Sequence, residues 1–239
     1  MLRRSLLAAT GALAAPRVRA ASPEDAVDVA LVLAIDVSGS LSDERLAMQR
    51  LGHARAVTSP AFLAALGANA RGQVGLAAIE WSNRDRQDLL VPWTVVEDEA
   101  SAWRVAGRLL RAPSPVPGFT SISGAIDFAA RLLARMPWEA ARRVVDISGN
   151  GRNNDGRSAA AARDEAAAAG ITVNGLPILD AEAGLDAYYA EEVIGGPDAF
   201  LVVAHDLGSF AEAIRRKLVR EIAAAPGRQA RGEDAADPA

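Results

Sequence analysis

The chain of 239 residues contains no cysteine and only two histidines, and Lys217 is its single lysine. Without cysteine the protein has no disulfides, no thiolate metal site, no cysteine nucleophile and no lipid anchor on an N-terminal cysteine. The two histidines, His53 and His205, lie too far apart in the sequence to indicate a histidine-rich metal site. Neither a Walker A motif nor a G-x-S-x-G motif is present, so the sequence indicates neither a P-loop nucleotide site nor an α/β-hydrolase nucleophile.

The first twenty residues are typical of an export signal. A basic pair, Arg3-Arg4, precedes a short apolar stretch over residues 6–15, and the small-residue sequence at 18–20 offers a cleavage site before Ala21. The run Arg3-Arg4-Ser5-Leu6-Leu7 resembles a twin-arginine signal. The apolar stretch is too short to span a bilayer comfortably, and no other segment of the sequence can. We expect a bacterial periplasmic or secreted protein, the alternative being a cytosolic protein with a short N-terminal helix.

Loss of residues 1–20, which hold four arginines and no acidic residue, changes the formal net charge from −4 to −8. An acidic exported protein without a basic cluster is a poor candidate for nucleic-acid binding. Half of the residues are hydrophobic, which suffices for one sizeable core but not for two ordinary domains. We therefore expect one domain over residues 27–225 and a disordered polar tail over residues 226–239.

Hydrophobic patterning predicts strands that alternate with helices. The expected strands cover residues 29–35, 74–81, 91–96, 143–148, 171–179 and 200–203. The expected helices cover residues 42–57, 100–111, 122–136 and 157–168, a segment near Glu191, and a last helix from Ser209 with a capping box completed by Glu212. Pro92 places its strand at an edge, and residues 82–90 are expected to form a polar loop. This order predicts an α/β fold with a doubly wound, mostly parallel sheet, helices on both faces and one antiparallel edge strand.

Polar residues follow the first strand at alternate positions. The unbroken apolar run over residues 29–35 predicts a buried parallel strand, and Asp36, Ser38 and Ser40 come directly after it. In open α/β sheets, ligands bind at the carboxyl ends of such strands. One carboxylate and two hydroxyls are hard oxygen donors, which suit Mg²⁺, Mn²⁺ or Ca²⁺ rather than zinc or copper. The same residue types also occur in ordinary turns.

Two further loops follow the same logic. Thr120 lies in a loop that leads directly into the helix expected from residue 122, and Asn150 lies in a turn rich in glycine and asparagine after the strand at 143–148. Each loop alone is compatible with simple turn chemistry. All three loops in this order are expected at the same edge of one sheet, which favours a single site.

Together the three loops resemble those of the von Willebrand factor A domain, which carry its metal-ion-dependent adhesion site (MIDAS). The resemblance rests on the D-x-S-x-S motif at Asp36, on Thr120 within Gly-Phe-Thr-Ser-Ile-Ser, and on a hydrophobic strand ending where the family has Thr-Asp-Gly. It covers about residues 28–225. It implies a Rossmann-like sheet with helices on both faces and a divalent ion, Mg²⁺ or else Mn²⁺ or Ca²⁺, at the top of the sheet.

The resemblance also implies a role for each residue of the site. Ser38 and Ser40 would ligate the ion through their hydroxyls, and Thr120 would ligate it directly in a ligand-bound state or through water otherwise. Asp36 would hold the serines and a coordinated water. The family's last aspartate falls on Asn150, which keeps an oxygen but loses the charge, so we expect the ion to be weakly held.

In this family an Asp or Glu of the partner typically completes the coordination. The resemblance therefore implies a protein-binding module with a carboxylate-bearing protein partner rather than an enzyme. Two alternatives stay open: a metal-dependent hydrolase of phosphate esters, for which only Asp36 is an obvious base, and a scaffold that binds partners without metal, which the loss of the aspartate at Asn150 would allow.

Several polar residues outside the motif are expected to have structural roles. We expect Asp146 to bond within the sheet or to Arg142, Glu80 to pair with an arginine at the rim, and Arg142-Arg143 to satisfy local acids. Asn153 and Asp155 border the site and are candidates for contacting the partner. The phrases at residues 174–178 and 193–197 resemble a bacterial exported branch of the family.

Overall fold

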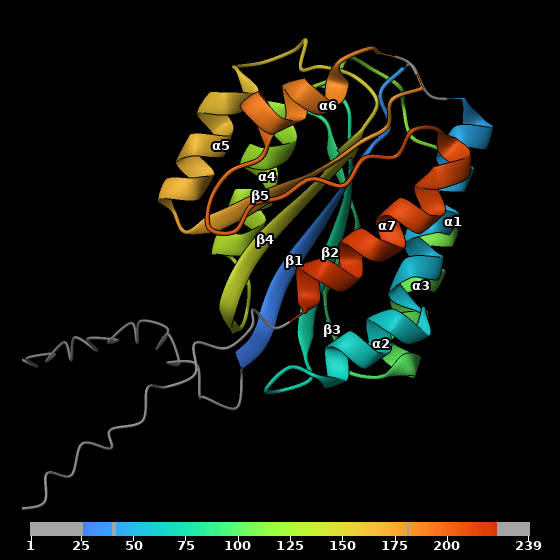
Figure 1. Cartoon of the computed structure of the whole chain (residues 1–239), viewed down its shortest axis with the longest axis vertical. Helices are drawn as coiled ribbons and strands as arrows, with labels where there is room; N and C mark the ends of the chain where they lie inside the picture. The colour runs from blue at the N-terminus through green and yellow to red at the C-terminus, as the bar shows by residue number, and fades with distance from the viewer. Residues whose placement is uncertain (1–25, 40–41, 181, 224–239) are drawn as a thin grey trace, which may run out of the picture.

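A five-stranded sheet runs through the centre of the computed structural model, which describes residues 26–39, 42–180 and 182–223. Its strands are β1 (Ala26–Asp36), β2 (Val74–Trp81), β3 (Gln87–Val96), β4 (Glu139–Gly149) and β5 (Ile171–Pro177). They lie in the order β3-β2-β1-β4-β5 (Figure 1). All neighbours are parallel except β3, which pairs antiparallel with β2 at the edge. The predicted leader at residues 1–20, the predicted tail at residues 226–239 and Ser40 lie outside the described residues.

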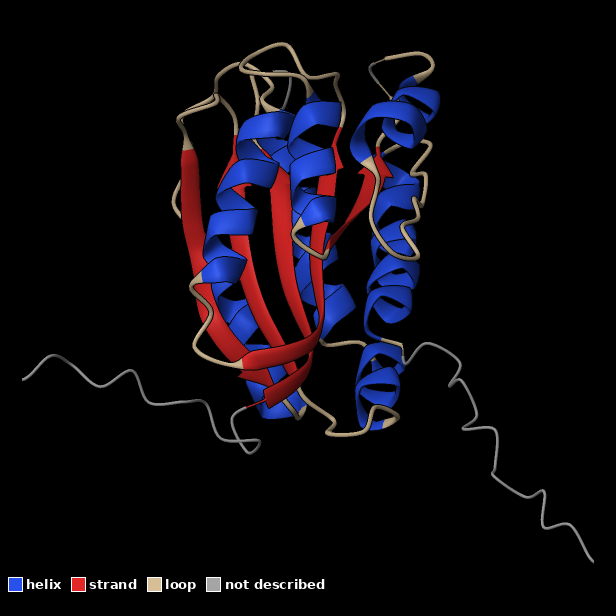
Figure 2. Cartoon of the chain, turned by 90° about the vertical axis from the view of Figure 1, so that its left-hand side faces the viewer, coloured by secondary structure: helices blue, strands red, loops and turns tan. Residues whose placement is uncertain are grey.

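Helices cover both faces of the sheet, as Figure 2 shows from the side. The described helices are α1 (Asp43–Val57), α2 (Pro60–Gly67), α3 (Glu99–Leu110), α4 (Ile122–Ala134), α5 (Ala159–Ala168), α6 (Leu185–Tyr188), the π-helical segment η2 (Tyr189–Val193) and α7 (Leu207–Ile222). Helices α1, α2, α3 and α7 cover one face, and α4, α5 and α6 cover the other (Figure 1). The predicted α/β fold, with a mostly parallel sheet and one antiparallel edge strand, is confirmed.

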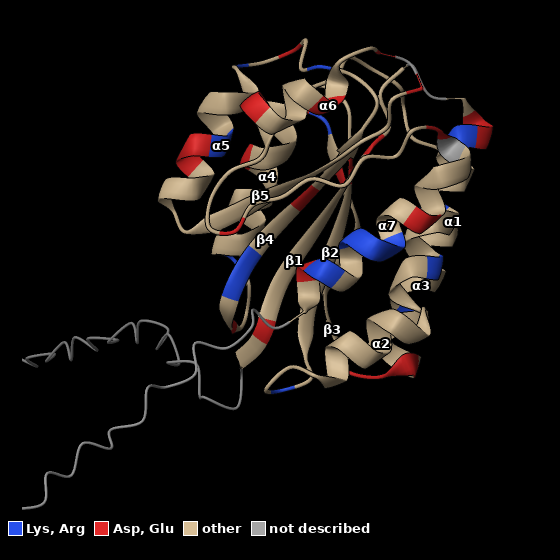
Figure 3. Cartoon of the chain, viewed as in Figure 1, with Lys and Arg blue, Asp and Glu red and all other residues tan. Residues whose placement is uncertain are grey.

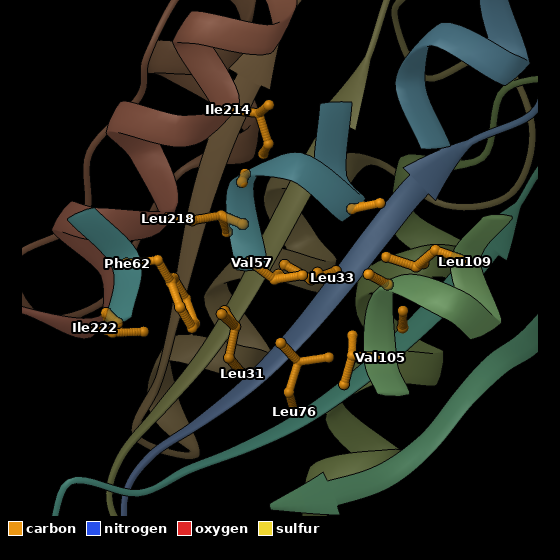
Figure 4. Packing of buried hydrophobic residues seen from close by; sticks show 14 of the residues in the cluster. Leu31, Leu33, Val57, Phe62, Leu76, Val105, Leu109, Ile214, Leu218 and Ile222 are labelled. Atoms are coloured by element: carbon orange, nitrogen blue, oxygen red, sulfur yellow. The ribbon is translucent and has the colours of Figure 1, made fainter. Parts of the chain in front are cut away.

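Alternate residues of β1 supply two separate hydrophobic cores. Leu31 and Leu33 pack against α1, α2, α3 and α7, whereas Val32 and Ala34 pack beneath α4 and α5. Figure 4 shows the first core, in which Phe62 and Leu218 lie in one cluster with Leu31 and Leu33 of β1. Because side chains alternate along a strand, a run that is apolar at every position must be covered on both faces. The apolar run of β1 therefore places this strand at the centre of the sheet, between β2 and β4.

The edge strand β3 begins four residues before its predicted start. Gln87 pairs with Trp81, and Asp88 pairs with Glu80, so the predicted loop at residues 82–90 shrinks to a tight connection between β2 and β3. Pro92 lies within this edge strand, as predicted. The polar residues Gln87 and Asp88 concealed the start of the strand, because an edge strand exposes much of its surface to solvent.

The sixth strand predicted at residues 200–203 is wrong. This segment forms only isolated bridges to the β5 side, from Leu201 to Gly175 and from Ala204 to Ile178. The N–H of Phe200 donates to the side chain of Asn174 at 2.7 Å, so it does not contribute to a regular ladder.

The start of the last helix also differs from the prediction. Asp206, not Ser209, is the N-cap of α7, and its carboxylate accepts from the N–H of Ser209 at 2.7 Å. Ser209 completes the capping box in the position predicted for Glu212. Both Asp and Ser favour N-caps, so composition alone could not choose between the two starts.

Lys217 is fully buried and joins α7 to the sheet. Its Nζ lies 2.6 Å from an oxygen of Asp146 on β4 and 2.5 Å from an oxygen of Glu221. The sequence predicted that Asp146 bonds within the sheet or to Arg142, but its partner is Lys217, and Arg142 donates to the carbonyl of Ala223. Arg143 donates to the carbonyl of Ala169 at 2.6 Å. Both arginines thus bond to backbone carbonyls rather than to the local acids predicted for them.

Among the described residues, no helix combines the length and the apolar character needed to cross a bilayer.

Candidate metal-binding site

The first loop of the site leaves β1 with the side chain of Asp36 fully buried. One carboxylate oxygen, Oδ1, accepts the backbone N–H of Ser38 at 2.7 Å, which turns the chain sharply at the strand end. Ser38 is only 2% exposed. The third member of the motif, Ser40, lies outside the described residues.

The second loop lies against the first. The N–H of Gly39 donates to the carbonyl of Gly118 at 2.8 Å, and this bond brings the loop that carries Thr120 beside the D-x-S-x-S loop. Thr120 is 7% exposed, and its backbone N–H donates to the side chain of Asn154 at 2.8 Å. The residue after it, Ser121, is the N-cap of α4. The threonine is thus fixed between a loop contact and a helix start.

The third loop completes the arrangement at the end of β4. The backbone N–H of Asn150 lies 3.4 Å from Oδ2 of Asp36, so both oxygens of that carboxylate receive backbone donors. A Cβ placed on Gly151 would lie 3.7 Å from Oγ1 of Thr120, which puts the second and third loops in contact. The structure therefore brings together all four predicted site residues that it describes, namely Asp36, Ser38, Thr120 and Asn150.

The close approach of the loops depends on Gly149. A Cβ at this position would lie 3.0 Å from Oδ2 of Asp36 and 2.8 Å from the hydroxyl of Tyr189. Tyr189 is fully buried, and its hydroxyl has no hydrogen-bond partner among the described residues. No sequence signal linked Tyr189 to Asp36, because the two residues are far apart in the chain.

Burial raises the pKa of Asp36 to about 6, against the opposing effect of the N–H donors of Ser38 and Asn150. Within the described part of the chain, no basic side chain forms an ion pair with this carboxylate. The pKa of Tyr189 is raised well above its ordinary value, first by burial and then by the charge of Asp36. A cation beside Asp36 would favour its ionised form.

The chemistry of the donors restricts which ion fits. Across residues 26–39, 42–180 and 182–223, no three His, Asp or Glu side chains gather as a metal site. The loops offer one carboxylate, hydroxyls and an amide, all of which present oxygen. Such a set fits a hard divalent cation such as Mg²⁺.

The residues that border the site brace its loops. Asp155 accepts the backbone N–H of Arg84 at 2.8 Å, and Asn153 accepts that of Ser123 at 3.0 Å. Both side chains were candidates for contacting a partner, and the structure gives each a role in connecting the loops.

Glu80 pairs with an arginine, as predicted, but in a buried position rather than at the rim. Its oxygens lie 2.6 and 2.7 Å from Nε and Nη2 of Arg50, and Glu80 is 2% exposed. The same guanidinium donates to the carbonyls of Ala112 and Pro113, each at 2.8 Å. The pair thereby anchors the start of the loop that leads to Thr120.

Solved structures with the same fold are von Willebrand factor A domains and related proteins. Proximal thread matrix protein 1 from the mussel byssus is similar with a TM-score of 0.59 and 12% identity, over 82% of this chain and 47% of that chain. Another structure of the mussel protein is described as having a zinc-occupied MIDAS motif. The von Willebrand factor type A protein from Catenulispora acidiphila gives a TM-score of 0.57 and 16% identity, over 82% and 43% of the two chains.

A third similar structure is close to this chain in length. BatB from Bacteroides thetaiotaomicron, described as a conserved hypothetical protein, gives a TM-score of 0.51 and 18% identity, over 81% of this chain and 98% of that chain. By contrast, this chain spans less than half of the mussel and Catenulispora chains. These likenesses show the fold.

No curated protein matches the chain. The family model described as "Protein of unknown function (DUF1194)" matches residues 26–226. With the fold of a von Willebrand factor A domain, the chain belongs to the DUF1194 family.

Proposed function

We propose that this domain captures a protein partner through a divalent cation held where the loops after β1 and β4 meet the loop before α4. The observation that carries the proposal is the buried carboxylate of Asp36, held by two backbone N–H groups and surrounded by the hydroxyl-bearing loops. A buried carboxylate is costly unless it is paired or coordinates a metal. A hard cation would remove that cost.

Each residue of the site has a part in this proposal. Ser38, Ser40 and Thr120 would hold the ion through their hydroxyl oxygens. Asp36 positions Ser38 and would hold a coordinated water, and Asn150 would do so through its amide oxygen. When bound, the ion supplies a Lewis-acidic position for an Asp or Glu carboxylate of the partner.

The proposed site has one carboxylate fewer than the motif it resembles, so it neutralises less of the ion's positive charge. With asparagine at position 150, Asp36 is the one acidic residue in the proposed set. We therefore expect weak binding of the free ion, preferably Mg²⁺ or alternatively Mn²⁺ or Ca²⁺, and a strong preference for an anionic partner. A module of this kind fits export to the periplasm or beyond, through the leader proposed for residues 1–20.

The test is isothermal titration of the metal-stripped protein with Mg²⁺ and Mn²⁺. Saturable binding is expected in the wild type and its loss in Ser38→Ala. Ser114→Ala is the matched control, because Ser114 is exposed in the loop that leads to Thr120 but lies six positions before it. Equal binding by Ser38→Ala and the wild type would exclude the site.

The partner is tested by capture from exported bacterial proteins with and without chelator. The proposal predicts that chelation and the double variant Ser38→Ala, Ser40→Ala both abolish capture while the fold stays intact. Capture that persists in chelator would instead identify a scaffold that works without metal.

A further inference from the structure

A cavity lies at the opposite end of the sheet from the proposed metal site. It has a volume of about 630 Å³ and is lined by residues at the starts of β4 and β5 and at the end of α7. Arg142 on β4 precedes Asn150 by eight residues, so at about 3.3 Å per residue the two ends are about 26 Å apart. Volumes of about 300–1,000 Å³ are typical of small-molecule sites. The cavity is thus separate from the site at Asp36.

Arginines give this cavity its chemical character. Arg142, Arg143 and Arg220 all line it. Figure 3 shows basic residues on the first part of β4 and on the C-terminal half of α7, the two elements that carry them. This local concentration contrasts with the acidic net charge of the whole chain.

Arg220 is held in place yet keeps its donors available. Its guanidinium carbon lies 3.8 Å from the centre of the Phe200 ring, and within the described part of the chain no carboxylate or carbonyl accepts from it. Arg142 donates through one nitrogen, Nη2, to the carbonyl of Ala223 at 2.9 Å. A guanidinium has five N–H donors, so both residues have donors to spare. Stacking and this hydrogen bond reduce the entropy that each side chain would lose on binding a ligand.

The acidic residues that line the cavity repel an anion only weakly. Glu221 receives Nζ of Lys217 at 2.5 Å and Nδ2 of Asn174 at 2.7 Å, so its two oxygens are already paired. Burial raises the pKa of Glu221, which favours its neutral form. Asp198 is the other acidic residue of the lining, and it is exposed.

Two sequence segments that do not contribute to the metal site lie together at this cavity. The phrase at residues 174–178 supplies Asn174, which accepts the N–H of Phe200, and the phrase at residues 193–197 supplies Pro197, whose carbonyl accepts from Thr172 at 2.9 Å. Gly196 has a φ of +89°, and a Cβ there would lie 2.5 Å from the carbonyl oxygen of Ile171. No other residue type fits that position without a shift of the backbone, so the local sequence is adapted to form this wall.

We propose that the cavity binds a small molecule that bears an oxyanion, a carboxylate or a phosphate, between Arg142 and Arg220. Guanidinium groups match both oxyanions through paired N–H···O hydrogen bonds. The hydroxyl of Thr172, which donates to Pro197, lines the same cavity and keeps its oxygen as an acceptor for the rest of the ligand.

The experiment titrates the whole protein with inorganic phosphate and, separately, with succinate, at constant ionic strength. The protein and buffers are freed of metal beforehand, no chelator is left in solution to compete as a carboxylate, and Ser38→Ala is the background, so that neither anion binds through a metal at Asp36. Saturable binding of at least one anion is expected, weakened about tenfold or more in Arg220→Gln and in Arg142→Gln. Arg216→Gln is the matched control, because Arg216 is also on α7, is 61% exposed and lies outside the cavity.

Each outcome decides the proposal. Binding of phosphate alone indicates a phosphorylated ligand, and binding of succinate alone indicates a carboxylate. No saturable binding of either anion, or equal weakening by Arg216→Gln, overturns it. Circular dichroism checks that each variant is folded, and if Arg142→Gln is not, the exposed Arg220 carries the test alone.

Discussion

The backbone N–H of Asn150 reaches the carboxylate of Asp36, at 3.4 Å from Oδ2. The loop after β4 is therefore held against the loop after β1 whichever side chain occupies position 150. This separates the geometry of the site, which the main chain provides, from its charge, which the side chain sets. A change at this position should alter metal affinity without displacing the loops.

Replacing Asn150 with aspartate should tighten Mg²⁺ binding. A second carboxylate adds attraction for the ion, and a gain of about 1.4 kcal/mol, tenfold in affinity, is a reasonable scale. In the metal-free variant two carboxylates share one buried site, so Mg²⁺ should also raise its melting temperature more than that of the wild type. Titration calorimetry and thermal melting measure the two effects.

The control for that variant is Asn154→Asp, which adds the same charge to the same loop. The acceptor Oδ1 for the N–H of Thr120 is preserved in this control. If Asn154→Asp tightens binding as much as Asn150→Asp, the gain is a general effect of charge. If neither does, Asn150 does not lie at the metal site.

Replacing Gly149 with alanine should destabilise the fold and weaken metal binding together. The added methyl group would lie 2.8 Å from the hydroxyl of Tyr189 and 3.0 Å from Oδ2 of Asp36, both in a buried site. Overpacking of this kind costs about 1–3 kcal/mol. Gly67→Ala is the matched control, because a Cβ there meets nothing within 4 Å. Urea unfolding would contradict the prediction if the two variants were equally stable.

The parts of the fold that the sequence predicted correctly are those with strong local patterns. The apolar run of β1 and the helix predicted over residues 42–57, observed as α1 with Ser42 as its N-cap, are both found where they were expected. The proximity of the loops of the site was predicted by a general rule of the fold, since residues at the carboxyl ends of parallel strands share one edge of the sheet. Asp36 and Thr120 were therefore placed together without knowledge of any contact between them.

The contacts that the sequence could not predict join residues that are distant in the chain. Nothing local to Asp146 indicates that its partner is Lys217 rather than Arg142, since the choice depends on how α7 crosses the sheet. The segment from Phe200 has the composition of a strand, but a side chain, Asn174, takes the N–H that a regular strand would use. Hydrophobic periodicity carries no information on either contact.

Replacing Lys217 with methionine should destabilise the protein strongly. The substitution leaves Asp146 and Glu221, both 1% exposed, in the core without the ammonium that pairs with them. Removing one partner of a buried ion pair costs about 3–5 kcal/mol. Arg216→Met, on the exposed side of the same helix, should cost far less. The free energy of unfolding in urea measures both, and a loss below about 1 kcal/mol for Lys217→Met would contradict the prediction.

The stability of the protein should also fall in mild acid because of His53. This histidine is 1% exposed, and its Nδ1 lies 2.9 Å from the carbonyl oxygen of Gln49. Burial lowers the pKa of His53 below its ordinary value of 6.5, and Lys217 on α7 lowers it further, whereas Gln49 and Asp146 on β4 oppose the shift. The buried histidine is therefore preferentially neutral in the folded protein.

A lowered pKa in the folded state makes the unfolded chain the better proton acceptor. Stability should therefore be full above pH 6.5 and fall as the pH drops toward the folded pKa, by at most about 1.4 kcal/mol per pH unit for one proton.

The loss of stability between pH 7.5 and 5.5, measured by urea unfolding, should be smaller in His53→Gln than in the wild type. His205→Gln removes the exposed histidine and should behave as the wild type does. Because each variant is compared with itself at two pH values, any packing that His53→Gln loses against Phe210 cancels. An equal loss in both variants would mean that another group causes the acid sensitivity.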